Sequence, residues 1–165
     1  MDKIDFFSVK TKEQIVEVET LAFDIWHEHY IPIIGIAQVE YMLKKFQSKE
    51  AIGKQIKEGY FYYLVKVNEK YVGYTGFEIK EEELFLSKIY IKSENRGKGY
   101  GKAIFDFIKT MAKKRDCKKI VLTVNKNNLN SIKAYKQMGF INKDPIVRDI
   151  GGGFIMDDYK MEKNN

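Results

Sequence analysis

Three glycines stand within five residues near the middle of the chain, between an apolar run and a segment whose apolar residues have helical spacing. The run 84–91 predicts a strand, and the residues from Ile104 to Met111 predict a core-facing helix. A glycine-rich turn between a strand and a helix points backbone N–H groups and the positive end of the helix dipole at one place. Because glycine has no Cβ, phosphate oxygens can approach those amides. The candidate pyrophosphate site therefore comprises Arg96, Gly97, Lys98, Gly99, Tyr100, Gly101 and Lys102.

The glycine spacing departs from two common nucleotide-binding patterns. A dinucleotide-binding turn needs Gly-x-Gly-x-x-Gly, but the third glycine here comes one residue early and Lys102 stands in its place. A P-loop needs Ser or Thr after its Gly-Lys pair, but Ala103 follows Lys102, and Arg96 stands where the first glycine belongs. Taken alone, the segment is also compatible with a simple glycine-rich turn that opens a lysine-rich helix.

A second segment adds an amide and a phenol. It follows the predicted buried strand 119–124 and contains Asn128, then Tyr135 seven residues later, then Gly139 and Phe140. This segment resembles the second signature of the GNAT acetyltransferase family, and the first segment, 96–101, resembles that family's Arg/Gln-x-x-Gly-x-Gly/Ala signature. The two occur in the family's order, and the predicted order of strands is similar to the family's over nearly the whole chain. The chain therefore resembles a GNAT-type N-acetyltransferase.

The resemblance implies that acetyl-CoA is the acetyl-donor cosubstrate. We expect no metal, because His27 and His29 have no third ligand nearby in sequence. The resemblance also implies a bulge in the strand that ends at Ile89, Tyr90 and Ile91. This bulge would splay the strand from strand 120–124 and open a V-shaped slot for pantetheine. Backbone groups near the bulge would pair with the pantetheine amides, and the amides of residues 97–102 would hold the pyrophosphate.

The same resemblance assigns roles to side chains of the second segment. Asn128 would bond the pantetheine arm, whereas Asn130 is expected only to cap its helix. Tyr135 would stand beside the sulfur, where a phenol of pKa about 10 can protonate a thiolate whose thiol has a pKa of about 8.5. The alternative is that Tyr135 only packs in the core beside Ile132. No general base is evident, because apolar residues occupy positions 85 and 86, on the strand where some members of the family use a glutamate as the base. Deprotonation of the amine through ordered water is an equal alternative to a direct carboxylate base.

The acceptor is expected at the end of the first helix, because enzymes of this kind place it between the first two helices and the last strands. The candidate acceptor-binding residues are Trp26, Glu28, His29 and Tyr30, facing a loop at 148–153. Aromatic faces together with a carboxylate suit an ammonium group. We therefore expect a small-molecule or polyamine-like amine that attacks acetyl-CoA directly in a ternary complex. The alternatives are a protein or peptide amine, a non-catalytic module that binds acyl-CoA or nucleic acid, and a helix end whose histidines merely suit its dipole.

The residue periodicities predict a single α/β domain over residues 1–165, with a mixed, mostly antiparallel sheet flanked by helices. A chain of 165 residues is long enough for one sizeable core. The expected strands are 3–9, 60–67, 71–79, 84–91, 119–124, 139–143 and 154–162. The expected helices are 11–30, 37–56, one after the glycines and a short one ending at Gly139. The glycines at 151–153 predict a mobile loop near the acceptor.

Composition and the N-terminal residues limit the partners and the cellular location that we expect for the protein. The formal net charge of +6 could favour a polyanion or a phosphorylated cofactor, but a solvated lysine-rich surface also explains it, so charge alone decides nothing. No apolar run approaches the length of a membrane span, so we expect no membrane partner, and we expect no nucleic-acid partner. The one cysteine, Cys117, excludes an internal disulfide and suits a reducing compartment. The N-terminal residues lack the layout of a secretory signal, so the cytoplasm is the expected location. A homodimer is left open.

Overall fold

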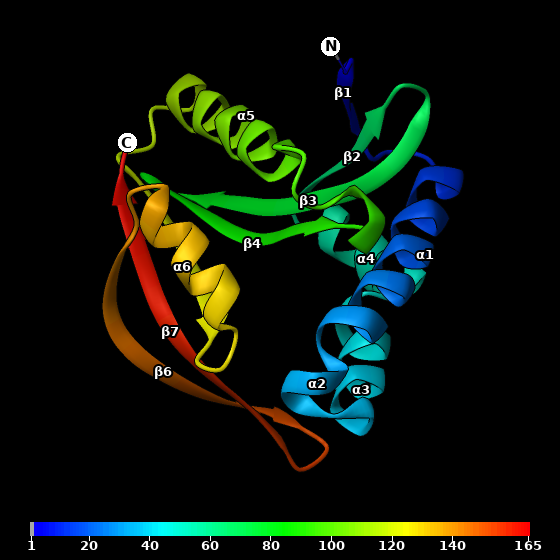
Figure 1. Cartoon of the computed structure of the whole chain (residues 1–165), viewed down its shortest axis with the longest axis vertical. Coiled ribbons are helices and arrows are strands. Elements are labelled where there is room, and N and C mark those ends of the chain that lie inside the picture. Colours follow the sequence, from blue (N-terminus) through cyan, green and yellow to red (C-terminus); the bar gives the residue numbers. More distant parts are fainter. Residues whose placement is uncertain (1) are drawn as a thin grey trace. The chain divides into compact units, whose positions relative to one another are not determined.

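The computed structural model describes residues 2–165, with the backbone alone for Lys88. Within these residues seven strands form one sheet in the order β1-β2-β3-β4-β5-β7-β6 (Figure 1). The strands are β1 (Ile4–Ser8), β2 (Phe61–Val67), β3 (Lys70–Lys80), β4 (Glu83–Ile91), β5 (Lys119–Asn125), β6 (Ile141–Gly151) and β7 (Phe154–Asn164). The helices are α1 (Lys12–His29), α2 (Ile31–Ile34), α3 (Ile36–Phe46), α4 (Lys49–Lys57), α5 (Tyr100–Lys114) and α6 (Leu129–Gln137), with a 3₁₀ turn at Ser93–Asn95.

The sheet is mixed and mostly antiparallel, which confirms the predicted fold class. Strand β2 pairs antiparallel with β1 and with β3, and β7 pairs antiparallel with β5 and with β6. Strands β4 and β5 pair in parallel, as the crossover through α5 allows. Their pairing joins 83–85 to 119–121 and, within the described residues, extends no further along β4. The predicted splay of β4 from β5 stays a prediction.

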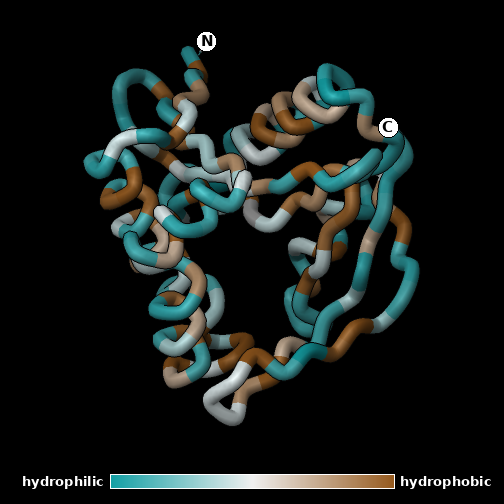
Figure 2. The backbone as a smooth tube through the Cα atoms, turned by 180° about the vertical axis from the view of Figure 1, so that it is seen from behind, coloured by the Kyte–Doolittle hydropathy of each residue, from teal (hydrophilic) through white to brown (hydrophobic). Residues whose placement is uncertain are grey.

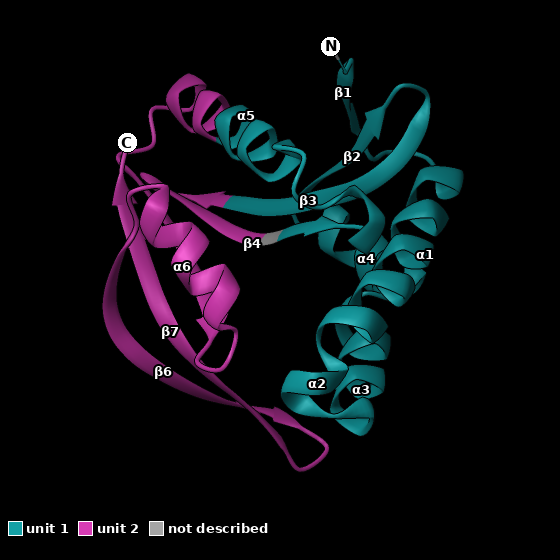
Figure 3. Ribbon diagram, viewed as in Figure 1, with its two compact units in different colours: residues 1–78, 88–108 teal, residues 79–87, 109–165 magenta. Residues whose placement is uncertain are grey.

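The chain divides into two compact units, and β3, β4 and α5 contribute residues to both. Unit 1 holds the residues up to Glu78 together with Lys88–Ile108, and unit 2 holds Ile79–Ser87 and Lys109–Asn165 (Figure 3). The single domain expected from the sequence stays a prediction.

None of the helices described in residues 2–165 combines the length and apolar content that crossing a membrane requires.

Unit 1 is built around the apolar face of α1 and the inner residues of β2 and β3. Helix α1 begins where predicted, because Thr11 and Gln14 cap it reciprocally: the Gln14 N–H donates to Thr11 Oγ1 at 3.1 Å, and the Thr11 N–H donates to Gln14 Oε1 at 3.0 Å. Its buried residues are Val18, Leu21, Ala22, Ile25 and Trp26. Hydrophobic and hydrophilic residues also alternate along α5 (Figure 2), whose residues Ile104 and Ile108 are fully buried.

The prediction of one helix over 37–56 is wrong, because the structure has two helices there, α3 and α4, separated by Gln47 and Ser48. Ser48 is the N-cap of α4, and its Oγ accepts from the Ala51 N–H at 3.2 Å. Gln47 is 1% exposed, and its side chain bonds the hydroxyls of Tyr62 and Tyr74. The buried amide therefore holds the chain at the break.

Unit 2 ends in a long β6–β7 hairpin that the sequence predicted only in part. Strand β7 was expected, but β6 runs from Ile141 to Gly151 instead of stopping near residue 143. Residues 148–151 therefore lie in a strand, and the predicted loop shortens to a turn around Gly152 and Gly153. Most of β6 is exposed, so its pairing with β7 rather than an apolar pattern defines it.

Candidate active site

The glycine-rich turn, which lies within unit 1, leads from β4 through the 3₁₀ turn into α5. Gly97 and Gly99 have φ of 77° and 84°, values that favour glycine. A Cβ at either position would meet nothing within 4 Å, so the space above both glycines is open. The first helical bond of α5 runs from the Ala103 N–H to the Gly99 carbonyl at 3.1 Å. The amides of residues 100–102 thus precede the first intrahelical acceptor and can bind an anion.

Cationic and polar side chains of the turn have different partners. Arg96 Nε donates to the Ile91 carbonyl at 3.2 Å, and exposed Lys102 lies 3.6 Å from Asp106. The Tyr100 hydroxyl donates to Asp2 Oδ2 at 2.6 Å. The hydrogen bond from Tyr100 is the main cause that lowers the pKa of Asp2, and nearby Lys98 lowers it further. The same bond raises the pKa of Tyr100.

The end of β4 presents alternate backbone groups to opposite sides. The Lys92 N–H donates to the Val72 carbonyl on β3 at 2.8 Å. A Cβ placed on Gly73 would lie 2.1 Å from the Tyr90 carbonyl oxygen, so that carbonyl also faces β3. In a regular strand, where backbone groups alternate, those of Ile89 and Ile91 would then face away from β3, and the predicted bulge at this end of β4 stays a prediction. This is the orientation that the predicted pantetheine role requires, and the role itself stays a prediction.

Gly73 is a residue that the sequence analysis missed. Its φ is not in the left-handed region, so it is needed for space and not for conformation. Only a residue without a Cβ lets β3 approach the Tyr90 carbonyl this closely. The available signal was a glycine inside the apolar run of residues 71–77, which is typical of a close backbone approach.

Four aromatic rings of unit 1 join part of the predicted acceptor group to β4. The Trp26 ring centroid lies 5.0 Å from that of Tyr30 and 5.6 Å from that of Tyr90. The Tyr90 ring also lies 5.5 Å from that of Tyr74. His29 contacts this group through Tyr30, at 4.7 Å between ring centroids. We call Trp26, Tyr30, Tyr74 and Tyr90 the aromatic cluster.

Glu28 lies apart from the aromatic cluster. It is exposed, and two residues along a helix correspond to roughly half a turn, so it stands on the opposite side of α1 from Trp26 and Tyr30. Trp26 itself is 4% exposed. The structure therefore brings Trp26, His29 and Tyr30 together and leaves out the predicted carboxylate.

A buried polar network supports the aromatic cluster. The Tyr74 hydroxyl donates to Gln47 Oε1 at 2.7 Å, and Gln47 Nε2 donates to the Tyr62 hydroxyl at 3.1 Å. The Tyr62 hydroxyl in turn donates to Gln55 Oε1. Burial raises the pKa of Tyr62 and of Tyr74 well above the usual value for a phenol, so both stay protonated donors. Satisfied buried networks of this kind hold the side chains above them in one arrangement.

The predicted residues of unit 2 lie on and before α6. Asn128 is 4% exposed and is the N-cap residue, although its side chain makes no cap hydrogen bond. Asn130 lies inside the helix, so its predicted capping role is wrong. Tyr135 is half-buried and packs edge-on against Phe140, at 5.6 Å between ring centroids.

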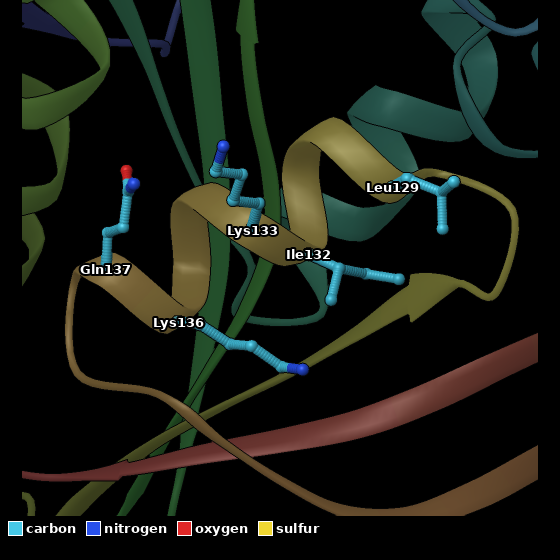
Figure 4. A pocket seen from close by; sticks show the side chains of 5 residues that line it. All are labelled: Leu129, Ile132, Lys133, Lys136 and Gln137. Carbon is cyan, nitrogen blue, oxygen red and sulfur yellow. The ribbon is translucent and has the colours of Figure 1, made fainter.

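A shallow, open depression of about 510 Å³ lies along α6, and its lining does not include Asn128 or Tyr135. Figure 4 shows the side chains that line it, which project from successive turns of the helix. They are Leu129, Ile132, Lys133, Lys136 and Gln137. The predicted roles of Asn128 and Tyr135 stay predictions.

Asp158 on β7 is a buried carboxyl that the sequence analysis did not single out. It is 2% exposed, and burial raises its pKa to about 6, against smaller lowering effects of Arg148 and a hydrogen bond from Thr123. The glutamates around the start of β4 are not buried in this way and form ion pairs instead: Glu82 pairs with Lys118 at 3.0 Å and Glu83 with Lys119 at 3.1 Å. Burial of Asp158 depends on the pairing of β7 with its neighbours, which the sequence does not display.

Comparison with known proteins identifies the family. The family model described as the acetyltransferase (GNAT) family matches residues 20–140, most of the chain, and the chain belongs to this family. This confirms the predicted family. An uncharacterized N-acetyltransferase of Methanocaldococcus jannaschii is 29% identical over 100 residues, which cover 56% of this chain and 43% of that protein. The chain thus aligns with less than half of the length of that relative.

Solved structures show the same fold. The PaiA N-acetyltransferase of Thermoplasma acidophilum, in complex with coenzyme A, matches with a TM-score of 0.82 and 21% identity over 99% of both chains. A spermidine N-acetyltransferase, the SpeG K23-Q34 chimera from Vibrio cholerae and hSSAT, matches with a TM-score of 0.72 and 13% identity over 98% of this chain and 95% of that one. At these identities the likeness concerns the fold alone.

Proposed function

We propose that this protein is an N-acetyltransferase that moves the acetyl group of acetyl-CoA to a small-molecule or polyamine-like amine, by direct attack in a ternary complex. The observation that carries the proposal is the glycine turn, which matches the family signature and opens α5 with two positive-φ glycines under open space. The relative solved with coenzyme A supports the choice of donor. Family membership supports the reaction class.

Residues of the first motif would bind the donor. The amides at the start of α5 would hold the pyrophosphate, because they lack intrahelical acceptors and lie at the positive end of the helix. Lys98 and Lys102 would add positive charge beside it. The backbone groups of Ile89 and Ile91 that face away from β3 would pair with the pantetheine amides.

The reaction needs an oxyanion site and a proton donor. A neutral amine attacks the thioester carbonyl, the C–N bond forms, and the carbonyl oxygen becomes an oxyanion that preorganised N–H groups stabilise. The C–S bond then breaks, and the thiolate takes a proton. We assign that proton to the Tyr135 hydroxyl, because a phenol stays protonated at neutral pH and can donate to the departing thiolate. The amine releases its proton to water, and a proton from water restores the phenol, so that the protons balance.

The acceptor would bind at the aromatic cluster, where the half-buried ring of Tyr30 offers a face to an ammonium group and the buried ring of Trp26 packs against Tyr30. The chimeric relative is a spermidine N-acetyltransferase, which supports amines of this class as candidates here. Since Glu28 lies on the other side of α1, aromatic faces and hydroxyls supply the contacts instead of a carboxylate.

Release of free CoA with a panel of amines tests the proposal. The panel contains n-butylamine, 1,4-diaminobutane, spermidine and a short peptide with a free N-terminus. We expect turnover with the small amines and a fall of about 10² to 10⁴ in kcat for Tyr135→Phe, with acetyl-CoA affinity retained. Tyr159→Phe in the same unit is the matched control. Turnover with the peptide and with none of the small amines would show that the acceptor is a peptide amine. Wild-type turnover by Tyr135→Phe would show that Tyr135 is only a packing residue.

A further inference from the structure

Two carboxyls that adjoin each other on β7 have different partners. Asp157 forms an ion pair with Lys126, at 2.8 Å. Asp158 is 2% exposed and accepts a hydrogen bond from the uncharged Thr123 hydroxyl. A carboxylate has about four lone-pair sites, so Asp158 keeps acceptor capacity for another donor.

The pairing of β5 with β7 places Asp158 at the carboxyl end of β5. It stands directly opposite Asn125, the last residue of that strand. Directly paired residues have their side chains on the same face of a sheet, and so do residues two apart on one strand. Asp158, Asn125 and Thr123 are therefore polar neighbours on one face, and Asn128 of the second motif follows shortly after. In open α/β sheets, ligands bind outside the carboxyl ends of parallel strands such as β4 and β5.

Helix α6 lies on the other face of these strands. Strands β5 and β6 are parallel, because both pair antiparallel with β7, so the helix that connects them covers one face of the three. Lys163 Nζ lies 3.0 Å from the position that a Cβ on Gly139 would take, just after α6. On β7, Lys163 and Asp158 are an odd number of residues apart, so their side chains point to opposite faces. Tyr135 on α6 and the Asp158 carboxyl therefore lie on opposite sides of the strands.

Acetyl transfer needs two proton-transferring groups that approach the acetyl carbon from different sides. In the tetrahedral adduct, the attacking nitrogen and the departing sulfur are bound to the same carbon. The group that serves the nitrogen must therefore come from another direction than the group that serves the sulfur. With Tyr135 assigned to the sulfur, a carboxylate on the opposite side of β5 suits the nitrogen.

The protonation of Asp158 also suits a base that works near neutral pH. Burial raises its pKa to about 6, while Arg148 on β6 lowers it and the adjacent Asp157 raises it. The carboxyl is therefore mostly ionised at pH 7, and its pKa is closer to that pH than the pKa of an ordinary aspartate. A pKa near the operating pH is what general base catalysis needs. Carboxyls with pKa values shifted in this way are typical of functional sites.

We propose that Asp158 is the general base of the acetyl transfer and takes the proton of the attacking amine. This inference rests on the proposed function, which supplies the amine and the thioester. The neutral amine forms the C–N bond, its nitrogen becomes positively charged, and an N–H proton then moves to a carboxylate oxygen of Asp158. The C–S bond breaks, and Tyr135 protonates the thiolate. Asp158 then releases its proton to water and a proton from water restores the phenol, so the amine proton reaches water through Asp158 instead of directly.

The test compares Asp158→Asn with the wild type in the release of free CoA from acetyl-CoA, with n-butylamine and 1,4-diaminobutane as probes, from about pH 5 to about pH 8. Asparagine keeps the size of the side chain and cannot take the proton. We expect kcat to fall about 10²-fold at neutral pH and the KM for acetyl-CoA to stay within about twofold of wild type. The ratio of wild-type to variant kcat should fall about tenfold for each pH unit below about 6, because the wild-type carboxyl is protonated there. Ionisation of the amine is common to both proteins and cancels from this ratio.

Asp157→Asn is the matched control, because Asp157 is the adjacent carboxyl of β7 and points to the other face, where it pairs with Lys126. We expect its kcat to stay within about twofold of wild type. An unchanged kcat in Asp158→Asn overturns the inference while the proposed function stands. A loss of the same size at every pH also overturns it, because a displaced side chain and not a missing base would then explain the loss. Absence of turnover with every small amine in the wild type contradicts the proposed function, and this inference falls with it.

Discussion

Two glycine-rich segments of this chain have similar backbones and different surroundings. In the turn at 97–101, Gly97 and Gly99 have φ of 77° and 84°, and in the hairpin at 151–153 the three glycines have φ of 62° to 89°. The space beside the glycines is also similar in the two segments, since a Cβ on Gly99 or on Gly153 would meet nothing within 4 Å. What differs is the next element, because α5 follows the first segment and β7 follows the second.

The following element decides what each glycine segment can do. Before α5, consecutive amides lie ahead of the first helical acceptor, and the helix dipole favours an anion there. In the hairpin, the backbone groups take part in the antiparallel pairing of β6 with β7, in which Asp149 pairs with Ile155 and Gly151 with Phe154. We therefore expect changes in the turn to alter acetyl-CoA binding and changes in the hairpin to alter stability.

The largest expected effect is that of Gly99→Val on acetyl-CoA binding. A branched side chain would fill the open space above the turn, so we expect the dissociation constant to rise more than a hundredfold in a calorimetric titration. Gly152→Val is the matched control, because it imposes the same positive-φ strain in the hairpin. Equal losses of affinity in the two variants would break the comparison, since strain alone would then explain both.

Asp158→Asn should change stability and leave binding alone. The pKa of Asp158 is raised from 3.8 to about 6, so the native state holds a proton that the unfolded state has lost between these values. Its contribution to stability is full below pH 3.8 and is lost as the pH rises through about 6. Relative to wild type, the asparagine variant should gain up to about 3 kcal/mol between pH 4 and pH 7 in urea unfolding. The same gain in Asp144→Asn, on exposed β6, would contradict this assignment.

Gly73→Ala separates a glycine needed for space from those needed for conformation. The new Cβ would lie 2.1 Å from the Tyr90 carbonyl, so β3 or β4 must shift. We expect a loss of about 1–3 kcal/mol in unfolding free energy, typical of an overpacked site, together with a raised KM for acetyl-CoA. Gly53→Ala in α4, where a Cβ would be 4.0 Å from its nearest neighbour, should not destabilise the protein. A Gly73→Ala variant as stable as wild type would show that the strands adjust freely.

The smallest expected effect concerns Asp2, which positions the glycine turn through Tyr100. Its carboxylate accepts from the Tyr100 hydroxyl at 2.6 Å and from Asn68 Nδ2 at 3.0 Å. Loss of this support in Tyr100→Phe or Asp2→Ala should raise KM for acetyl-CoA severalfold with kcat unchanged. Asp2→Asn keeps an acceptor and should recover most of the affinity. If Asp2→Asn is as weak as Asp2→Ala, the charge and not the hydrogen bond supports the turn.

Much of the fold could be predicted because local signals and tertiary structure agree. The capping pair Thr11 and Gln14 marked the start of α1, and the glycine turn marked the start of α5. The break at Ser48 was missed, because it depends on Gln47 reaching tyrosines on two distant strands. The length of β6 was missed for a related reason: its polar residues resemble a loop until β7 pairs with them.

The candidate site was predictable where it is a local motif and not where it depends on contacts between distant segments. The glycine turn and the Asn128–Phe140 segment could be recognised because each resembles a local signature of the family. The direction of the Tyr90 ring, the close approach at Gly73 and the burial of Asp158 follow from strand neighbours that lie far away in sequence. Glu28 shows the converse, since it adjoins His29 in sequence and still faces away from Trp26 and Tyr30.

Thermal unfolding with and without acetyl-CoA tests the central claim, that the turn before α5 binds the donor, most directly. A ligand that binds the native state stabilises it by about 2.7 kcal/mol at a hundredfold excess over its dissociation constant. For a chain of this size we expect Tm to rise by about 5–10 °C in the wild type and to stay unchanged in Gly99→Val. An unmoved Tm with saturating acetyl-CoA, together with a rise on adding NAD or ATP, would contradict the account.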